Sequence, residues 1–130
     1  MSMTIWDFGG RHEASSPSEL ELILLKRYTP GVNGFWLSHD NEKHPTMSML
    51  VNGDLATLGY FPRESHPGFT PTGGIAGLDK SGTTTFSIDT VEQETEIWNE
   101  QVVPFSTAVS VAKDFLASKE LPRSIEWTEL

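Results

Sequence analysis

The sequence has no cysteine, no long apolar run and few basic residues. Without cysteine the chain has no structural disulfides, no zinc sites built on thiolates and no cysteine nucleophile. No stretch of about 18 apolar residues occurs, and the start, MSMTIWDFGG, lacks the charged end and apolar core of a secretory signal. We therefore expect a cytoplasmic protein with no membrane partner.

The shortage of basic residues gives the chain a strongly acidic balance. Nine Lys and Arg stand against 18 Asp and Glu, for a net charge of −9. This charge opposes binding to nucleic-acid phosphates and favours a basic protein partner or simple solubility. The excess lies late in the chain, because residues 87–130 hold nine acids and three bases. We expect no nucleic-acid partner.

Apolar residues are nevertheless plentiful enough for a core. Hydrophobic residues make up 37% of the 130, and they include four Trp, seven Phe and two Tyr. A chain of this length fits one domain, and neither a repeat nor a linker interrupts it. We expect residues 1–130 to form a single domain.

Two helices are predicted. The first follows Ser16, which can cap the amides of the first turn while Glu19 completes a capping box, and it should end near Tyr28 because a Thr-Pro pair comes next. The second opens at Pro104, shows helical apolar spacing and ends before Pro122.

The rest of the chain shows short β-type runs. Strands are predicted at 35–37, 47–51, 54–60, 84–88, 92–98 and 124–128, with a long loop over 62–82. A type I′ turn at Asn52 and Gly53 would pair Val51 with Asp54. The expected fold class is α+β, an antiparallel sheet with two main helices packed on one face.

Catalytic and cofactor signatures are missing from the sequence. There is no G-x-S-x-G elbow, and the glycines of residues 73–77 lack the lysine and spacing of a phosphate-binding loop, so they predict a turn. We expect no catalytic residue and no cofactor.

One cluster of polar residues leaves an alternative open. His39, Asp40, Glu42 and His44 bring metal-ligand types together within six residues, although the spacing matches no known metal motif. A solvated loop is the ordinary interpretation. The alternative is a small metal-binding or hydrolytic enzyme that uses His39 and His44.

Residues 89–100 contain five acids and no base. On an extended strand Glu92, Glu94 and Glu96 would fall on one face, since side chains alternate with period two. Such a row must be wet or must meet a positive surface, which leaves two interpretations: a charge-protected edge strand, or a steering surface for a basic partner.

Tryptophans offer a second kind of candidate contact. Trp36 and Trp127 lie in β-type runs and are expected to pack in the core. Trp98, beside the acidic row, is the one we expect to be most exposed, as an anchor in an interface.

Several segments together resemble a known family. Residues 47–56, 60–62, 66–69, 82–86 and 103–104, with the ending 125–127, resemble the first family of polymorphic-toxin immunity proteins, often encoded beside deaminase toxins. The resemblance implies an inhibitor that binds a cognate toxin, for example a DNA cytidine deaminase, and covers its active site. It brings no catalytic residue with it.

We therefore predict a protein that acts by binding a cognate, basic toxin domain. The candidate contact residues are Asp89, Glu92, Glu94, Glu96, Trp98, Glu100 and Phe69. A further alternative is an adaptor domain that recognises peptides by adding a strand to an exposed sheet edge.

Overall fold

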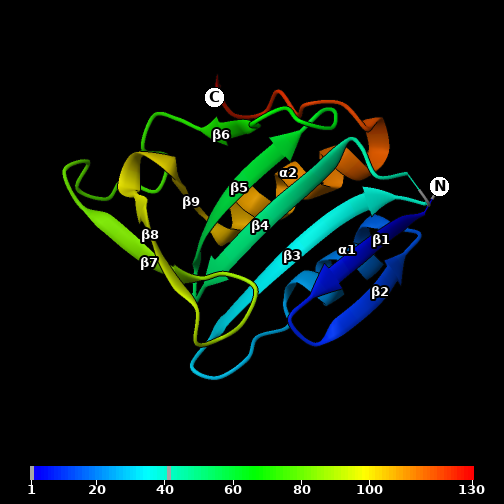
Figure 1. The fold of residues 1–130 in the computed structure, drawn as a ribbon, viewed down its shortest axis with the longest axis horizontal. Helices are drawn as coiled ribbons and strands as arrows, with labels where there is room; N and C mark the ends of the chain where they lie inside the picture. The colour runs from blue at the N-terminus through cyan, green and yellow to red at the C-terminus, as the bar shows by residue number, and fades with distance from the viewer. Residues whose placement is uncertain (1, 41) are drawn as a thin grey trace.

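The computed structural model describes residues 2–40 and 42–130, and its main feature is a large antiparallel sheet (Figure 1). Within these residues the sheet has eight strands, and a separate hairpin has two. In spatial order the large sheet holds β10 (Trp127–Glu129), β6 (Phe69–Pro71), β5 (Leu55–Phe61), β4 (Thr46–Asn52), β3 (Val32–His39), β1 (Met3–Asp7) and β2 (Gly10–Ala14), while β9 (Val102–Pro104) also pairs with β5.

The remaining elements are the hairpin and the helices. They are β7 (Thr83–Ser87), β8 (Glu94–Trp98), the short 3-10 turn η1 (Asn99–Gln101), α1 (Pro17–Leu24) and α2 (Phe105–Ser118). A large antiparallel sheet with two helices confirms the predicted α+β class. In the described residues, neither helix has the length and apolar character needed to cross a membrane.

Helix α1 begins where the capping signal predicted. The hydroxyl of Ser16 accepts a hydrogen bond from the amide of Glu19 at 3.2 Å, and the carboxylate of Glu19 accepts one from the amide of Ser15 at 2.9 Å. The helix ends at Leu24, a turn earlier than expected. Both backbone groups of Tyr28 are bonded to Val32, which commits that residue to a bridge leading into β3.

The β4–β5 hairpin is present, but its predicted register is wrong by two residues. Val51 pairs with Ala56, and the two-residue turn is formed by Gly53 and Asp54. Gly53 has a φ of +59°, as the first position of a hairpin turn requires. This register moves Asp54 off the buried side of the hairpin and into the exposed turn.

Alternation along β3 and β4 separates core residues from outward residues. From Phe35 onward in β3, and along β4, every second side chain is buried; these include Phe35 and Leu37 of β3 with Met47, Met49 and Val51 of β4. They belong to one cluster with Leu20 and Leu24 of α1 and with the buried residues of α2, which lies behind β4 and β5 in Figure 1.

The positions of two side chains in β3 make two predictions wrong. Trp36 is 47% exposed, because Phe35 and Leu37 on either side of it are the residues turned toward the core. His39 is not in a solvated loop but buried in β3, with Nε2 3.1 Å from the carbonyl oxygen of Leu116. Trp127 does pack against the core, and its indole donates to the carbonyl of Pro122.

Strands β1, β2 and β9 of the large sheet were not among the strand ranges predicted from the sequence. β1 and β2 form a hairpin at one end of the sheet, and β1 pairs with β3 in a register that sets Trp6 opposite Trp36. Residues 62–82, predicted as a long loop, include β6, which pairs with both β5 and β10.

Phe115 of α2 offers a direct test of the core. Its ring contacts those of His39, with centroids 4.8 Å apart, and Tyr60, at 5.8 Å. Phe115→Ala should lower the free energy of unfolding by about 3–5 kcal/mol, because it leaves a cavity among side chains that cannot close it. Urea unfolding measures this. The exposed Ser110→Ala on the same helix is the control, and an equal shift in both variants would contradict this packing.

Candidate functional site

The β7–β8 hairpin carries most of the acids predicted to contact a partner. Glu94, Glu96 and Trp98 alternate along β8 and lie on its exposed face. The side chain of Trp98 is 59% exposed, more than Trp6 at 50% or Trp36, as expected. Together these residues form a surface that is acidic and carries one large aromatic side chain.

Glu92 does not belong to this row, which corrects the sequence prediction. It lies before β8 in the turn that joins the two strands, residues 88–93. The turn is closed by hydrogen bonds from the amide of Ile88 to the carbonyl of Gln93 and from the hydroxyl of Ser87 to the carbonyl of Val91. Glu92 is exposed there and adds charge to the end of the hairpin, not to its strand face.

Glu96 is held in place by threonine hydroxyls of β7. Thr85 and Thr83 lie on the neighbouring strand, and each donates a hydrogen bond to one carboxylate oxygen of Glu96. The bond from Thr83 is 2.8 Å long. These hydrogen bonds, with that of Thr85 the stronger, lower the pKa of Glu96 below its usual range. The charge on this face is therefore kept to lower pH than that of an ordinary glutamate.

Two other predicted contact residues lie away from the strand face. Glu100 is exposed in η1 and lines a shallow pocket together with Trp98. Phe69 in β6 is half-buried, with its ring stacked on that of His66 at 5.3 Å and against Tyr60 at 6.0 Å. The hairpin and Glu100 are close to one another, whereas Phe69 is bound into the packing near the core.

The glycine-rich segment after β6 forms a turn, as predicted. The amide of Gly77 donates to the carbonyl of Gly74, and Gly73, Gly74 and Gly77 all have positive φ. The same segment is tied to its neighbours by the amide of Gly74, which donates to the carbonyl of Glu100 at 3.0 Å.

The residues of the alternative metal site have different surroundings. His39 is buried, whereas Glu42 is exposed and pairs with Lys119 of the segment after α2. Asp40 is also exposed, and its carboxylate accepts from Ser2. Among the residues that the structure describes, no three metal-ligating side chains converge. His44 is half-buried beside Pro45.

A groove on the outward face of the sheet was missed by the sequence reasoning. It follows one row of paired residues, Trp6, Trp36 and Ser48, across β1, β3 and β4. Phe61 faces Trp36 with ring centroids 5.8 Å apart. We call this feature the aromatic groove; its volume is about 360 Å³ and it is lined by Trp6, Asp7, Phe8, Gly34, Phe35, Trp36, Ser48, Leu50, Phe61, Ile88 and Asp89.

The aromatic groove adjoins the β7–β8 hairpin, which we call the acidic hairpin because it exposes Asp89, Glu92, Glu94 and Glu96. Ile88 and Asp89, in the turn between β7 and β8, form part of its lining, and this turn crosses in front of β3 in Figure 1. Asp89 is exposed and has a φ of +66°, a conformation that Asp and Asn adopt more readily than most residues. The groove and the hairpin therefore share Asp89.

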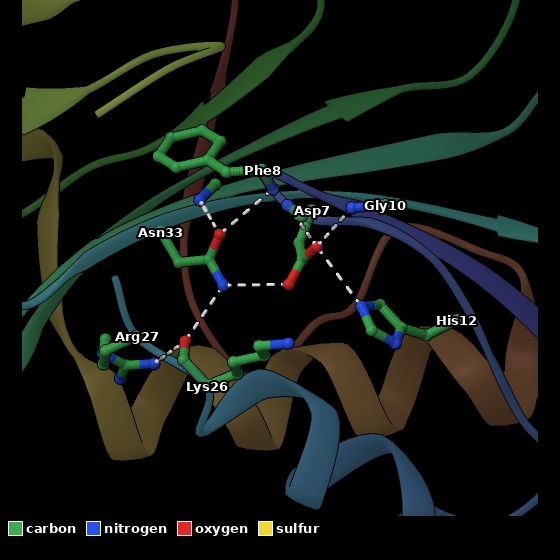
Figure 2. A network of polar contacts seen from close by, with 9 residues as sticks. Asp7, Phe8, Gly10, His12, Lys26, Arg27 and Asn33 are labelled. Carbon is green, nitrogen blue, oxygen red and sulfur yellow. Dashed lines mark hydrogen bonds and ion pairs between the residues drawn. The ribbon is translucent and has the colours of Figure 1, made fainter. Parts of the chain in front are cut away.

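A buried network supports one side of the groove (Figure 2). The side chain of Asn33, fully buried at the start of β3, accepts from the amides of Phe8 and Gly34 and donates to Asp7 and to the carbonyl of Lys26. All four of its hydrogen-bonding positions are used. The network joins the β1–β2 turn, the segment after α1 and β3.

Asp7 is the charged member of this network. Its side chain is fully buried, and its carboxylate accepts from the amides of Gly9 and Gly10, while Nε2 of His12 lies 3.3 Å away. Burial raises the pKa of Asp7, but the hydrogen bonds from Asn33 and Gly9 and the nearby His12 outweigh it, so the pKa lies below its usual range.

Comparison with known proteins gives the family. The family described as "Immunity protein Imm1" matches residues 9–129, nearly the whole chain, so the chain belongs to this family of immunity proteins. It is also 26% identical over 124 residues to the double-stranded DNA deaminase immunity protein of Burkholderia cenocepacia (strain H111), an alignment that covers 95% of this chain and 97% of that protein. The resemblance inferred from the sequence is confirmed.

The depressed pKa of Asp7 predicts a pH-dependent stability. Its ionised form is favoured in the folded state, so the contribution is present above the unfolded value, near 3.8, and is lost as the pH falls through the lower folded value. Asp7→Asn should therefore lower the urea midpoint at about pH 6, and its deficit relative to wild type should shrink as the pH drops below about 3.8.

The exposed Asp114→Asn in α2 is the control for this measurement. Its deficit, if any, should not follow the same pH window, because no buried network surrounds that carboxylate. A deficit for Asp7→Asn that stayed constant down to about pH 2 would contradict the role assigned to the ionised carboxylate.

Proposed function

We propose that this protein is the immunity partner of a deaminase toxin, which it neutralises by binding and not by catalysis. The match to the Imm1 family over residues 9–129 carries this proposal. The similarity to a double-stranded DNA deaminase immunity protein supports the finer proposal that the toxin is a DNA cytidine deaminase. The protein would act in the cytoplasm of the cell that produces the toxin.

The acidic hairpin is the surface that best fits such a toxin. A deaminase that acts on DNA needs a basic surface to hold the phosphate backbone and a pocket to receive the target base. Glu94 and Glu96 on the strand, with Asp89 and Glu92 in the turn, offer that basic surface a competing set of negative charges. Binding there would cover the active site and exclude DNA.

The fold leaves this surface available. We infer that residues 1–130 form one immunity domain in which both helices cover a single face of the large sheet, since their buried residues join one cluster with the inner side chains of the strands. The opposite face and the hairpin beside it are then open to a partner. Trp98 would serve as an aromatic anchor among the charges, with Glu100 at the margin.

The proposal is tested by co-expression with the toxin encoded next to this gene. The two proteins should purify as a stable complex, cells that make the toxin should grow only when this protein is present, and purified toxin should lose deaminase activity on DNA when it is added. If no complex forms and growth is not rescued, the protein is not the immunity partner of that toxin.

Charge reversal on the hairpin should slow association. Glu92→Lys combined with Glu94→Lys is expected to lower the association rate constant by about tenfold at low salt and to flatten its salt dependence, because steering by opposite charges is lost. Stopped-flow or biosensor kinetics at several salt concentrations measure both effects.

A matched control carries the same change in net charge elsewhere. Asp114→Lys combined with Glu120→Lys alters two exposed acids of α2 and the segment after it. Its association rate should change much less. Equal slowing by both pairs would show that only net charge matters and would place the interface away from the hairpin.

A further inference from the structure

We propose that the aromatic groove receives an arginine side chain of the toxin. This inference rests on the proposed function and adds to it the site of an anchor and the chemistry of the residue that enters. It concerns the outward face of β1, β3, β4 and β5, which none of the acidic strand residues occupies.

The shape of the groove results from small residues placed among large ones. In the row that crosses the sheet, Trp6 and Trp36 are followed by Ser48 and then Gly59. A Cβ on Gly59 would lie 2.7 Å from Oγ of Ser48 and 3.0 Å from the ring of Phe61, so the position has no space for a side chain. The ring of Phe61 therefore covers Gly59 and lies beside Trp36, and these two rings line the groove together with the small side chain of Ser48. The volume of the groove, about 360 Å³, lies at the lower end of the range for ligand pockets and is large enough to admit one long side chain.

The walls of the groove favour a flat cation. Trp6 and Trp36 are about half exposed, so part of each side chain is accessible in the free protein. Aromatic faces attract cations, Trp most strongly, and a planar guanidinium can also stack on them. Exposure of two neighbouring tryptophans to water is unfavourable compared with exposure of polar side chains. Exposed apolar patches of this kind mark binding sites.

The charge at the groove selects the same ligand. Its lining contains no Lys, Arg or His. The carboxylate of Asp7 is buried and occupied by its own hydrogen bonds, whereas Asp89 at the mouth is exposed and can pair with an incoming cation. Arginine combines the stacking plane with a fork of donors that matches one carboxylate.

Charge also argues against a second copy of the same chain as the occupant. Each copy carries −9 and would bring its own Asp89 to the same face of its partner. A nucleic acid is disfavoured for the same reason, because its phosphates would approach an acidic rim. A basic protein partner is the occupant that this charge distribution attracts.

The groove is built in advance and is not formed by the ligand. A Cβ on Gly34 would lie 2.8 Å from the ring of Phe8, so this ring packs directly on the backbone of β3. Asn33 bonds the amide of Phe8 at 3.3 Å and that of Gly34 at 2.8 Å, which fixes both residues at the end of the groove. A preformed site loses little conformational entropy when a side chain enters it.

The first experiment measures the affinity of the cognate toxin for groove variants. Trp36→Ala should weaken binding by about thirtyfold or more, as expected for an interface anchor, and Trp36→Phe should weaken it much less. Asp89→Asn, which keeps the turn conformation, should weaken binding by about tenfold and reduce its salt dependence. Leu22→Ala, at an exposed apolar position of α1, is the control and should bind as wild type.

The second experiment identifies the occupant. Each exposed arginine and lysine of the toxin is changed to Ala and tested against wild type and Trp36→Ala in double-mutant cycles. One arginine should weaken binding to wild type strongly and have little further effect on Trp36→Ala. Urea unfolding of every variant shows whether the fold is kept, and Trp36→Phe provides the test if Trp36→Ala is unstable.

The outcomes separate this inference from the proposed function. If the toxin binds wild type tightly and binds all groove variants equally well, the groove is not an anchor site but the immunity function stands. Coupling to a lysine only, or sedimentation that shows a dimer dissociated by Trp36→Ala, also overturns the inference. If wild type binds no deaminase toxin, both proposals fall.

Discussion

Side chains of a β-strand must alternate between two faces, and in β3 and β4 this constraint determines both halves of the molecule. Phe35 and Leu37 turn inward to the cluster shared with the helices, and the same geometry forces Trp36 outward. The core and the aromatic groove are thus two sides of the same strands. A shift of one residue in the pairing of β3 would bury the tryptophan and expose the phenylalanine, so a single register defines the stable packing and the shape of the open face.

Local signals in the sequence were enough for much of this fold. The caps of α1, the apolar spacing of α2 and most of the inner strands depend on neighbours only a few residues away. The β1–β2 hairpin was missed because its apolar run is short, and the β4–β5 register because Asn-Gly and Gly-Asp turns compete at the same place. The observed turn leaves Asp54 exposed and pairs Val51 with Ala56, and this choice depends on which side chains the whole sheet buries.

The sequence predicted the candidate site only where its residues lie close together on a single strand. Alternation along β8 correctly groups Glu94, Glu96 and Trp98, but it places Glu92 wrongly because the strand begins later. Nothing near Trp36 in the sequence indicates Trp6, which joins it through the pairing of β1 with β3, thirty residues apart. His39 was misjudged for a related reason: its polar neighbours predicted a loop, whereas Phe115 from a distant helix covers its ring.

The hairpin of β7 and β8 is a separate two-stranded sheet with one buried side and one exposed side. Phe86 on its inner side is fully buried, and the side chain of Asn52 in β4 donates to the carbonyl of Thr85, so these contacts attach the hairpin to the body. Glu94, Glu96 and Trp98 lie on the exposed face of the hairpin. The exposed positions of β8 lie outside the buried cluster, so their side chains can be exchanged with little effect on the packing of the core.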